Sequence, residues 1–289
     1  AFEAGMLPGD ILYQVDGETV TGKDLDLVVK ENIRGEEGTY VDITVLRGEN
    51  AEETPLHVER RSIEVPTVEY QMLENQVGYI YVTQFDEVTA KQFEDAIDDL
   101  EDQGMEKLVI DLRNNPGGVL DTAVEMLAYV LPEDKLDGML VYTADKNGEG
   151  DRYFCKDGKI QRESDDGSRD SRYPKEDDHE LDVPLAVLVN GNSASASEVF
   201  TGAVMDYDAG IVVGTTTFGK GIVQNLIPLG DGTAIKLTTA HYYTPNGFDL
   251  HGKGLEPDVV VEMDEELQKK AVVELSEDNQ LQAAIEAMN

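Results

Sequence analysis

The chain has 289 residues, which is enough for one large hydrophobic core and a smaller second unit. It carries 60 acidic and 23 basic residues, and the formal net charge of −37 argues against nucleic acid or an anionic membrane as a direct partner. A single cysteine, Cys155, excludes an internal disulfide and any cysteine-based metal cluster.

Residues 1–62 are predicted to form a small first unit. The first six residues have the pattern of the middle of an element, so we expect the natural chain to begin upstream, together with any export signal or anchor. A turn, a short strand and a short amphipathic helix ending near Gly35 are predicted next. They precede a half-buried strand in which Val41, Ile43 and Val45 alternate.

Residues 4–12 (Ala-Gly-Met-Leu-Pro-Gly-Asp-Ile-Leu), followed by Asp16 and Gly17, resemble the second half of a PDZ domain. PDZ domains add a peptide strand to a sheet edge and hold its terminal carboxylate. The early strands and the carboxylate-binding loop of such a domain have no counterpart in this chain. The resemblance implies a truncated PDZ-like domain that binds peptides, and a plain structural unit is the alternative.

Residues 63–289 alternate between predicted strands and helices, which indicates an α/β (α+β) core with mixed sheets. The segment 144–182 differs because it is crowded with Asp, Glu, Gly, Ser and Lys, so we expect a hairpin and a long polar surface insertion there. Within it, Asp177-Asp178-His179-Glu180 lacks a turn glycine or a second histidine. This run predicts a solvated charged surface and no metal site.

A buried-strand pattern over 108–112 runs into Pro116-Gly117-Gly118, and a helix pattern follows. Glycines at such a turn let the backbone approach a ligand closely. A plain strand–helix turn is the alternative interpretation. No P-loop lysine follows, so the pattern does not predict a phosphate site.

A second strand pattern, Val187 to Val189, stops at Asn190-Gly191 and gives way to small residues that open a helix near Ala196. A serine at this junction lies where backbone N–H groups are unpaired and the helix dipole is positive, which suits the oxyanion of acyl transfer. The alternative is a capping box, with Ser195 as the N-cap and Glu198 three residues on.

Lys220 lies between two glycines with Phe218, Ile222 and Val223 around it. Apolar surroundings disfavour the charged form of a lysine, so this pattern is typical of a lysine that acts as a base. Gln224 follows four residues later and points to the same side of the segment as Lys220.

Ser193-Ala194-Ser195-Ala196-Ser197-Glu198, then Phe218-Gly219-Lys220-Gly221 and Gln224, resemble the motifs of the C-terminal processing peptidases, also called tail-specific proteases. The resemblance implies a serine–lysine dyad of Ser195 and Lys220, with Gln224 in support. Residues 111–118 are similar to the family's turn that supplies one oxyanion donor. By resemblance that donor is the Gly118 N–H, with Gly117 as the next choice, and the second donor is the Ala196 N–H.

The resemblance further implies a crotonase- or ClpP-like protease core over 63–289, preceded by the truncated PDZ-like domain over 1–62. It implies a serine endopeptidase that cleaves protein or peptide substrates with free, unstructured, apolar C-terminal tails, without a metal or organic cofactor. The expected location is extracytoplasmic, in the periplasm or at the cell surface, with an upstream membrane anchor as one option. A homo-oligomer is one option for the assembly.

Three alternatives stay open on the sequence. A histidine base would have to be His241 or His251, because His57 lies in the first unit and His179 in the charged run. A crotonase-like enzyme would use paired N–H groups on an acyl thioester and would not need Ser195, but the charge of −37 offers no basic patch for coenzyme phosphates. A non-catalytic scaffold would only bind peptides.

Overall fold

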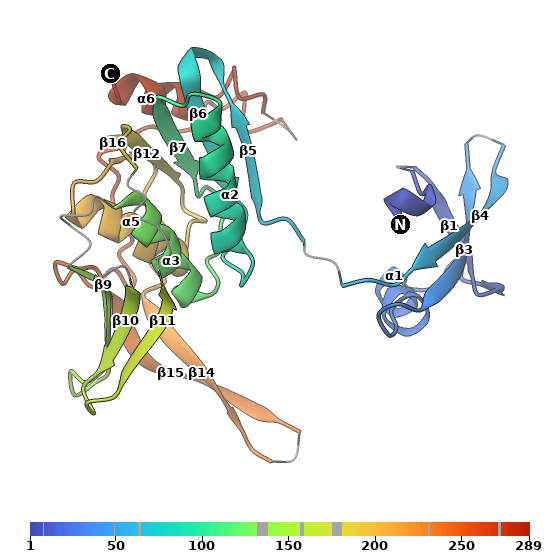
Figure 1. Cartoon of the computed structure of the whole chain (residues 1–289), viewed down its shortest axis with the longest axis horizontal. Helices are drawn as coiled ribbons and strands as arrows, with labels where there is room; N and C mark the ends of the chain where they lie inside the picture. The colour runs from blue at the N-terminus through green and yellow to red at the C-terminus, as the bar shows by residue number, and fades with distance from the viewer. Residues whose placement is uncertain are drawn as a thin grey trace. The chain divides into compact units, whose positions relative to one another are not determined.

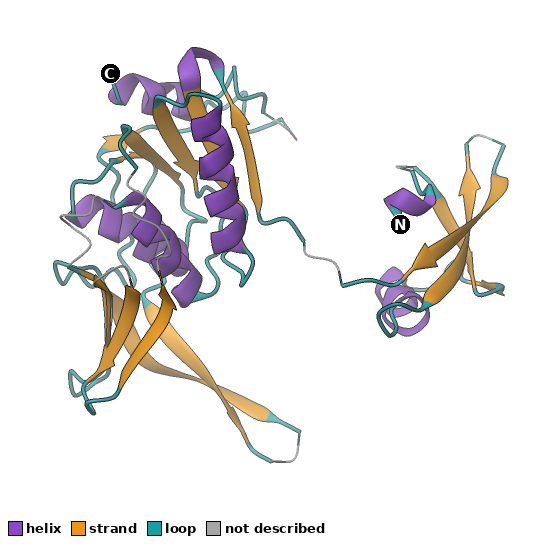
Figure 2. Ribbon diagram, in the orientation of Figure 1, coloured by secondary structure: helices purple, strands orange, loops and turns teal. Residues whose placement is uncertain are grey.

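The computed structural model divides into two compact units, Ala1–Val65 and Pro66–Asn289 (Figures 1 and 2). It describes residues 1–7, 9–48, 50–62, 65–131, 138–156, 159–174, 181–230, 232–270 and 273–289. The charged run at 177–180 lies outside these ranges, so its predicted solvation stays a prediction.

The first unit is a four-stranded antiparallel sheet with short helical segments. The predicted alternation is confirmed, because Val41, Ile43 and Val45 are all buried in its core. The strand order is β2-β1-β3-β4, and the elements are η1 (Phe2–Ala4), β1 (Ile11–Val15), β2 (Glu18–Thr19), α1 (Leu25–Val28), η2 (Val29–Ile33), β3 (Tyr40–Arg47) and β4 (Glu52–Glu59).

The second unit is built on a six-stranded sheet whose strands are parallel except for β5, which pairs antiparallel with β6. Its order is β16-β13-β12-β7-β6-β5, with β5 (Val68–Met72), β6 (Val77–Val82), β7 (Lys107–Asp111), β12 (Leu185–Val189), β13 (Ile211–Gly214) and β16 (Val259–Val260). All five residues of β12 are buried, as expected for a parallel strand that is covered on both faces.

Helices cover the two faces of this sheet (Figure 1). Three of them, α2 (Thr89–Asp102), α3 (Leu120–Val130) and α5 (Ala196–Asp206), pack with one set of alternating strand residues, and α6 (Asn279–Ala287) packs with the other set. A short 3₁₀ turn, η3 (Glu74–Gln76), joins β5 to β6. In the described ranges, none of the helices has the length and apolarity that a bilayer-spanning helix needs.

A second six-stranded sheet is antiparallel throughout, in the order β11-β10-β9-β8-β15-β14. Its strands are β8 (Met139–Ala144), β9 (Asp151–Lys156), β10 (Lys159–Ser164), β11 (Arg169–Pro174), β14 (Ile222–Pro228) and β15 (Ala234–Tyr243). Three of them come from the segment 144–182, where the sequence predicts a hairpin and a surface insertion. Tyr153, Cys155 and Ile160 are buried in the main core, so this mostly polar segment packs against the rest of the second unit through a few apolar side chains.

Candidate active site

The loop after β12 places Ser195 directly before the first residue of α5. Ser195 has φ 58° and ψ −115°, a backbone conformation that is uncommon and strained for a residue with a side chain. Among the three serines of this loop, Ser193 and Ser197 are fully buried, whereas Ser195 is half-buried. Strain at an accessible hydroxyl is typical of a functional residue held by the structure around it.

The two buried serines have structural partners. The Ser193 hydroxyl donates to the Leu112 carbonyl over 2.8 Å, and the Ser197 hydroxyl donates to the Asn115 carbonyl over 3.0 Å. Both bonds fasten the serine loop to the loop that follows β7. The accessible Ser195 is therefore the residue of the three that can meet a substrate.

The glycine turn after β7 lies against Ser195. A Cβ atom at Gly117 would lie 2.8 Å from Ser195 Cβ and 2.9 Å from Ala196 N. At Gly118, where φ is 150°, a Cβ atom would lie 1.8 Å from the Phe85 carbonyl oxygen. Only glycine allows these approaches, so the turn lies in close contact with the serine loop. Its predicted approach to a ligand stays a prediction.

The backbone N–H groups of this region differ in whether they already donate a hydrogen bond within the protein. The Gly117 N–H donates to Asn115 Oδ1 over 2.9 Å. Within the described part of the chain, the N–H groups of Gly118 and Ala196 have no hydrogen-bond acceptor. Gly118 and Ala196 directly follow Gly117 and Ser195, the two residues that the close approach brings together, and their role as oxyanion donors stays a prediction.

Glu198 joins the serine loop to the loop that carries Lys220. This side chain is fully buried, and its Oε2 accepts from the N–H groups of Ser195 at 2.9 Å and Lys220 at 2.8 Å. Its Oε1 accepts from the Thr217 hydroxyl at 2.6 Å and the Gly219 N–H at 2.7 Å. The contact with Ser195 is the one expected of a capping box, whereas no pattern in the sequence predicts the other three contacts.

The side chains of Lys220 and Gln224 are not hydrogen-bonded to each other or to Ser195 in the structure. Lys220 is half-buried, and its ammonium group has no hydrogen bond or ion pair to any residue within the described ranges. Gln224 is exposed on β14, and its Nε2 donates to Thr238 Oγ1 over 3.3 Å. The role of Gln224 as a support for Lys220 stays a prediction.

The histidine alternatives lie together on the second sheet and the loop after it. His241 Nδ1 is 3.6 Å from Asp249 Oδ1, and its ring packs edge-on against His251 with centroids 5.0 Å apart. Neither ring is hydrogen-bonded to Ser195. Throughout the described ranges, His, Cys, Asp and Glu side chains form no group of three or more that could hold a metal ion.

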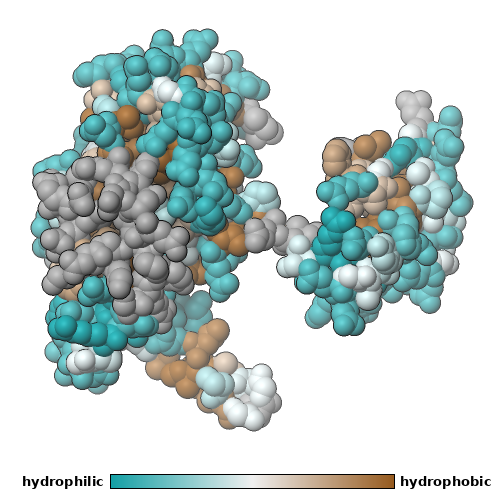
Figure 3. Space-filling view, in the orientation of Figure 1, coloured by the Kyte–Doolittle hydropathy of each residue, from teal (hydrophilic) through white to brown (hydrophobic). Residues whose placement is uncertain are grey.

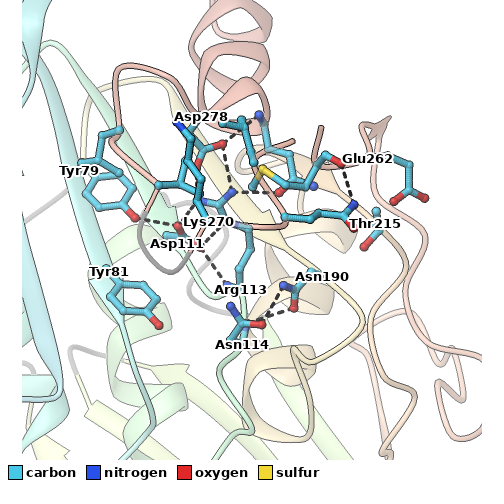
Figure 4. Close-up of a pocket in the computed structure, with 16 residues that line it drawn as sticks. Tyr79, Tyr81, Asp111, Arg113, Asn114, Asn190, Thr215, Glu262, Lys270 and Asp278 are labelled. Atoms are coloured by element: carbon cyan, nitrogen blue, oxygen red, sulfur yellow. Dashed lines mark hydrogen bonds and ion pairs between the residues drawn. The ribbon is translucent and has the colours of Figure 1, made fainter. Parts of the chain in front are cut away.

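A pocket of about 760 Å³ lies beside these loops, at the ends of β7 and β12 (Figure 4). Arg113 lies in it, buried, and donates to Asp111 and to Asp278, the N-cap residue of α6. Burial works against a charged guanidinium, but the hydrogen bonds to the two carboxylates raise the pKa of Arg113 above its ordinary value. Burial, and then the Asp111 carboxylate, raise the pKa of the Tyr79 hydroxyl, which donates to Asp111 over 2.7 Å.

This network fixes the loop that carries Gly118. Asp111 also accepts from the Arg113 N–H over 2.9 Å, and Asn115 Nδ2 donates to the Val82 carbonyl over 2.8 Å. The C-terminal helix is thus bound through Asp278 and Arg113 to the start of the glycine turn. Nothing in the sequence signalled this pairing, because the two residues are 165 positions apart.

Comparison with known proteins identifies the family of this chain. A model described as Peptidase family S41 matches residues 76–261. The chain is 39% identical over 262 residues to a "Probable CtpA-like serine protease" of Staphylococcus aureus (strain bovine RF122 / ET3-1). That match covers 91% of this chain and 48% of the relative, so the chain spans about half the length of the curated relatives it matches.

Solved structures agree with this assignment. The photosystem II D1 C-terminal processing protease is similar over 90% of this chain and 65% of that one, with 29% identity and a TM-score of 0.54. The "Putative S41 protease from Bacteroides fragilis NCTC 9343" shares the fold over 100% of this chain and 75% of its own, at 17% identity and a TM-score of 0.59. The predicted α/β class and the resemblance to the C-terminal processing peptidases are confirmed, and the chain belongs to peptidase family S41.

Proposed function

We propose that this protein is a serine endopeptidase that uses Ser195 and Lys220 as a catalytic dyad. Three loops meet at Ser195, and this observation carries the proposal. Ser195 itself is strained and accessible, and two N–H groups beside it have no acceptor among the described residues. The loop of Lys220 is bound to the Ser195 backbone through Glu198. Family membership supports the reaction class. It favours peptide hydrolysis over the crotonase-type reaction.

In the proposed reaction, Ser195 Oγ attacks the carbonyl carbon of the scissile peptide bond while the neutral amine of Lys220 takes its proton. The N–H groups of Gly118 and Ala196 bind the negative oxygen of the tetrahedral intermediate. Lys220 returns the proton to the leaving amine, and an acyl-enzyme on Ser195 remains. Water then hydrolyses this ester by the same steps in reverse.

The amine of Lys220 is not engaged by another side chain. Among the described residues it has no carboxylate partner that would compete with the Ser195 hydroxyl for it. Glu198 binds the backbone of Lys220, not its side chain. The proposed role of Gln224, which is to orient the amine, requires its side chain to leave Thr238.

The proposed substrates are proteins with unstructured, apolar C-terminal tails, which the family resemblance implies. One similar solved structure is named as a C-terminal processing protease of the photosystem II D1 protein. We further propose an extracytoplasmic location and peptide binding by a PDZ-like unit over 1–62, both of which the family resemblance implies.

A pair of reporters tests this function. One unfolded reporter ends in an apolar tail, and its partner carries acidic residues at the same tail positions. We expect the protein to cleave the first faster, because a chain with a net charge of −37 repels an acidic tail. Mass spectrometry of the products locates the cleaved bond. Cleavage of both reporters at equal rates would refute the proposed tail preference, and cleavage that persists in Ser195→Ala would refute the proposed mechanism.

A further inference from the structure

The strands β14 and β15 form a hairpin that extends from the second unit and exposes an unusual amount of apolar surface (Figures 1 and 3). Leu226 is 70% exposed, and the other exposed apolar residues are Ile227, Leu229, Ile235 and Leu237. Side chains are exposed on both faces of the hairpin, since neighbours along each strand point to opposite sides. A two-stranded hairpin of this kind is at best marginally stable without further packing.

The hairpin also has free edges. β14 is the last strand of its sheet, and in the described part of the chain it pairs only with β15. Among the described residues, β15 pairs with β8 only from His241 to Tyr243, so the other edge of the hairpin is free from Ala234 to Ala240. Proteins usually protect such edges with charges, bulges or prolines, because unpaired N–H and C=O groups bind other extended chains. Along β14 the only proline is Pro228, at the far end, and the strand has no charged residue. Its pairing with β15 has one irregularity, between Val223 and Gln224. In the described part of the chain, no further strand pairs with the edge from Ile222 to Ile227.

The low charge of the hairpin favours the binding of an uncharged, apolar segment. Residues 222–243 contain one lysine, Lys236, and one acid, Asp231, in a chain that has 60 acidic residues. This segment is close to neutral, whereas most of the chain repels acidic partners. An uncharged or weakly basic polypeptide meets no such repulsion here.

The open edge leads to the proposed catalytic residues. β14 begins at Ile222, two residues after Lys220. The carbonyl of Gly221, between them, accepts from the Tyr242 N–H over 3.0 Å, so sheet-like pairing extends up to Lys220. A polypeptide that is paired with this edge is therefore held next to the loop that Glu198 fastens to Ser195.

We propose that an extended apolar segment of the substrate adds as a third strand to the edge of β14 between Ile222 and Ile227. The proposal rests on the proposed peptidase function and names the surface that holds the substrate. Backbone hydrogen bonds supply affinity for any unfolded chain, and the exposed apolar side chains favour apolar residues. A folded substrate cannot offer a free strand, so this mode of binding also selects unstructured tails.

The chain offers a matched pair of variants for the test. Ile227 on β14 is paired directly with Ile235 on β15, and their exposed fractions are 43% and 49%. A strand added to β14 would place a side chain roughly 5 Å from Ile227 and about 10 Å from Ile235. Ile227→Ser should therefore weaken peptide binding by about two- to fivefold, and Ile235→Ser should not.

Binding is measured on the Ser195→Ala protein, with a fluorescent apolar peptide and with versions N-methylated at one residue each. Strand addition predicts that N-methylation weakens binding at every second residue, because alternate N–H groups face the partner strand. Equal losses in Ile227→Ser and Ile235→Ser, or N-methyl effects without this alternation, would overturn the proposal. If the protein forms dimers and both variants abolish them, the hairpin binds a second copy of this chain and the proposal is wrong.

This measurement does not depend on turnover. If the peptide binds with the predicted alternation but the wild-type protein hydrolyses none of it, strand addition stands and the peptidase function fails. If the wild type hydrolyses the peptide and Ile227→Ser has the same KM and peptide affinity as Ile235→Ser, the peptidase function stands and strand addition fails.

Discussion

Replacing Lys220 by alanine is expected to lower kcat/KM for peptide hydrolysis by about 10⁴- to 10⁶-fold, the range measured when one member of a hydrolase catalytic unit is removed. A serine hydroxyl is a weak nucleophile without a base to take its proton. The effect should fall on kcat, because the substrate is held by other surfaces. Steady-state cleavage of the apolar-tail reporter measures it.

A chemical rescue makes this prediction specific. The chain has one cysteine, Cys155, and it is buried, so Lys220→Cys introduces the only accessible thiol that the described structure would have. Treatment with 2-bromoethylamine converts that thiol into a close analogue of lysine and should restore part of the activity. Wild-type protein treated in the same way is the control. Full activity in untreated Lys220→Cys would contradict a lysine base and make His241 the leading candidate.

Glu198→Gln is expected to lower the free energy of unfolding by about 2–4 kcal/mol, although it changes a single atom. Two donors point at each carboxylate oxygen, and in either orientation an amide would direct its NH₂ group at two of them. Each buried donor left without an acceptor costs about 1–3 kcal/mol. Urea unfolding measures the change, with the exposed Glu265→Gln as a control expected to stay within about 0.5 kcal/mol.

The same variant should lose activity beyond its loss of stability. Glu198 is the side chain that binds both the Ser195 N–H and the Lys220 N–H, so without it the two loops are no longer fixed to each other. We expect a fall in kcat at temperatures where the variant is fully folded, with little change in KM. A variant that is destabilised as predicted but keeps the wild-type kcat would show that Glu198 supports the fold alone.

Local patterns in the sequence were enough to locate the loops that we propose to be catalytic. The strand pattern before Asn190 and the small residues before α5 predicted the strand–turn–helix junction that carries Ser195. Pro116-Gly117-Gly118 predicted a turn whose backbone can approach another group closely, and in the structure Gly117 lies against the serine loop. These features are set by residues near one another in the chain, and periodicity and turn chemistry report on such features directly.

Features that depend on distant contacts could not be predicted. The carboxylate of Glu198 meets a loop about twenty positions away, and Arg113 meets Asp278 across 165 positions. The segment 144–182 was predicted to be a surface insertion because most of its residues are polar, although Tyr153, Cys155 and Ile160 are buried in the core. Side-chain positions at Lys220 and Gln224 also depend on packing that no short pattern encodes.

Covalent labelling with a fluorophosphonate tests the central claim most directly, because the reagent forms a stable bond only with an activated serine. We predict one phosphonate per chain, mapped by mass spectrometry to Ser195, with no label on the buried Ser193 and Ser197. Labelling should be absent in Ser195→Ala and much slower in Lys220→Ala. A label on another serine, or equal labelling rates in the wild type and Lys220→Ala, would contradict the proposed dyad.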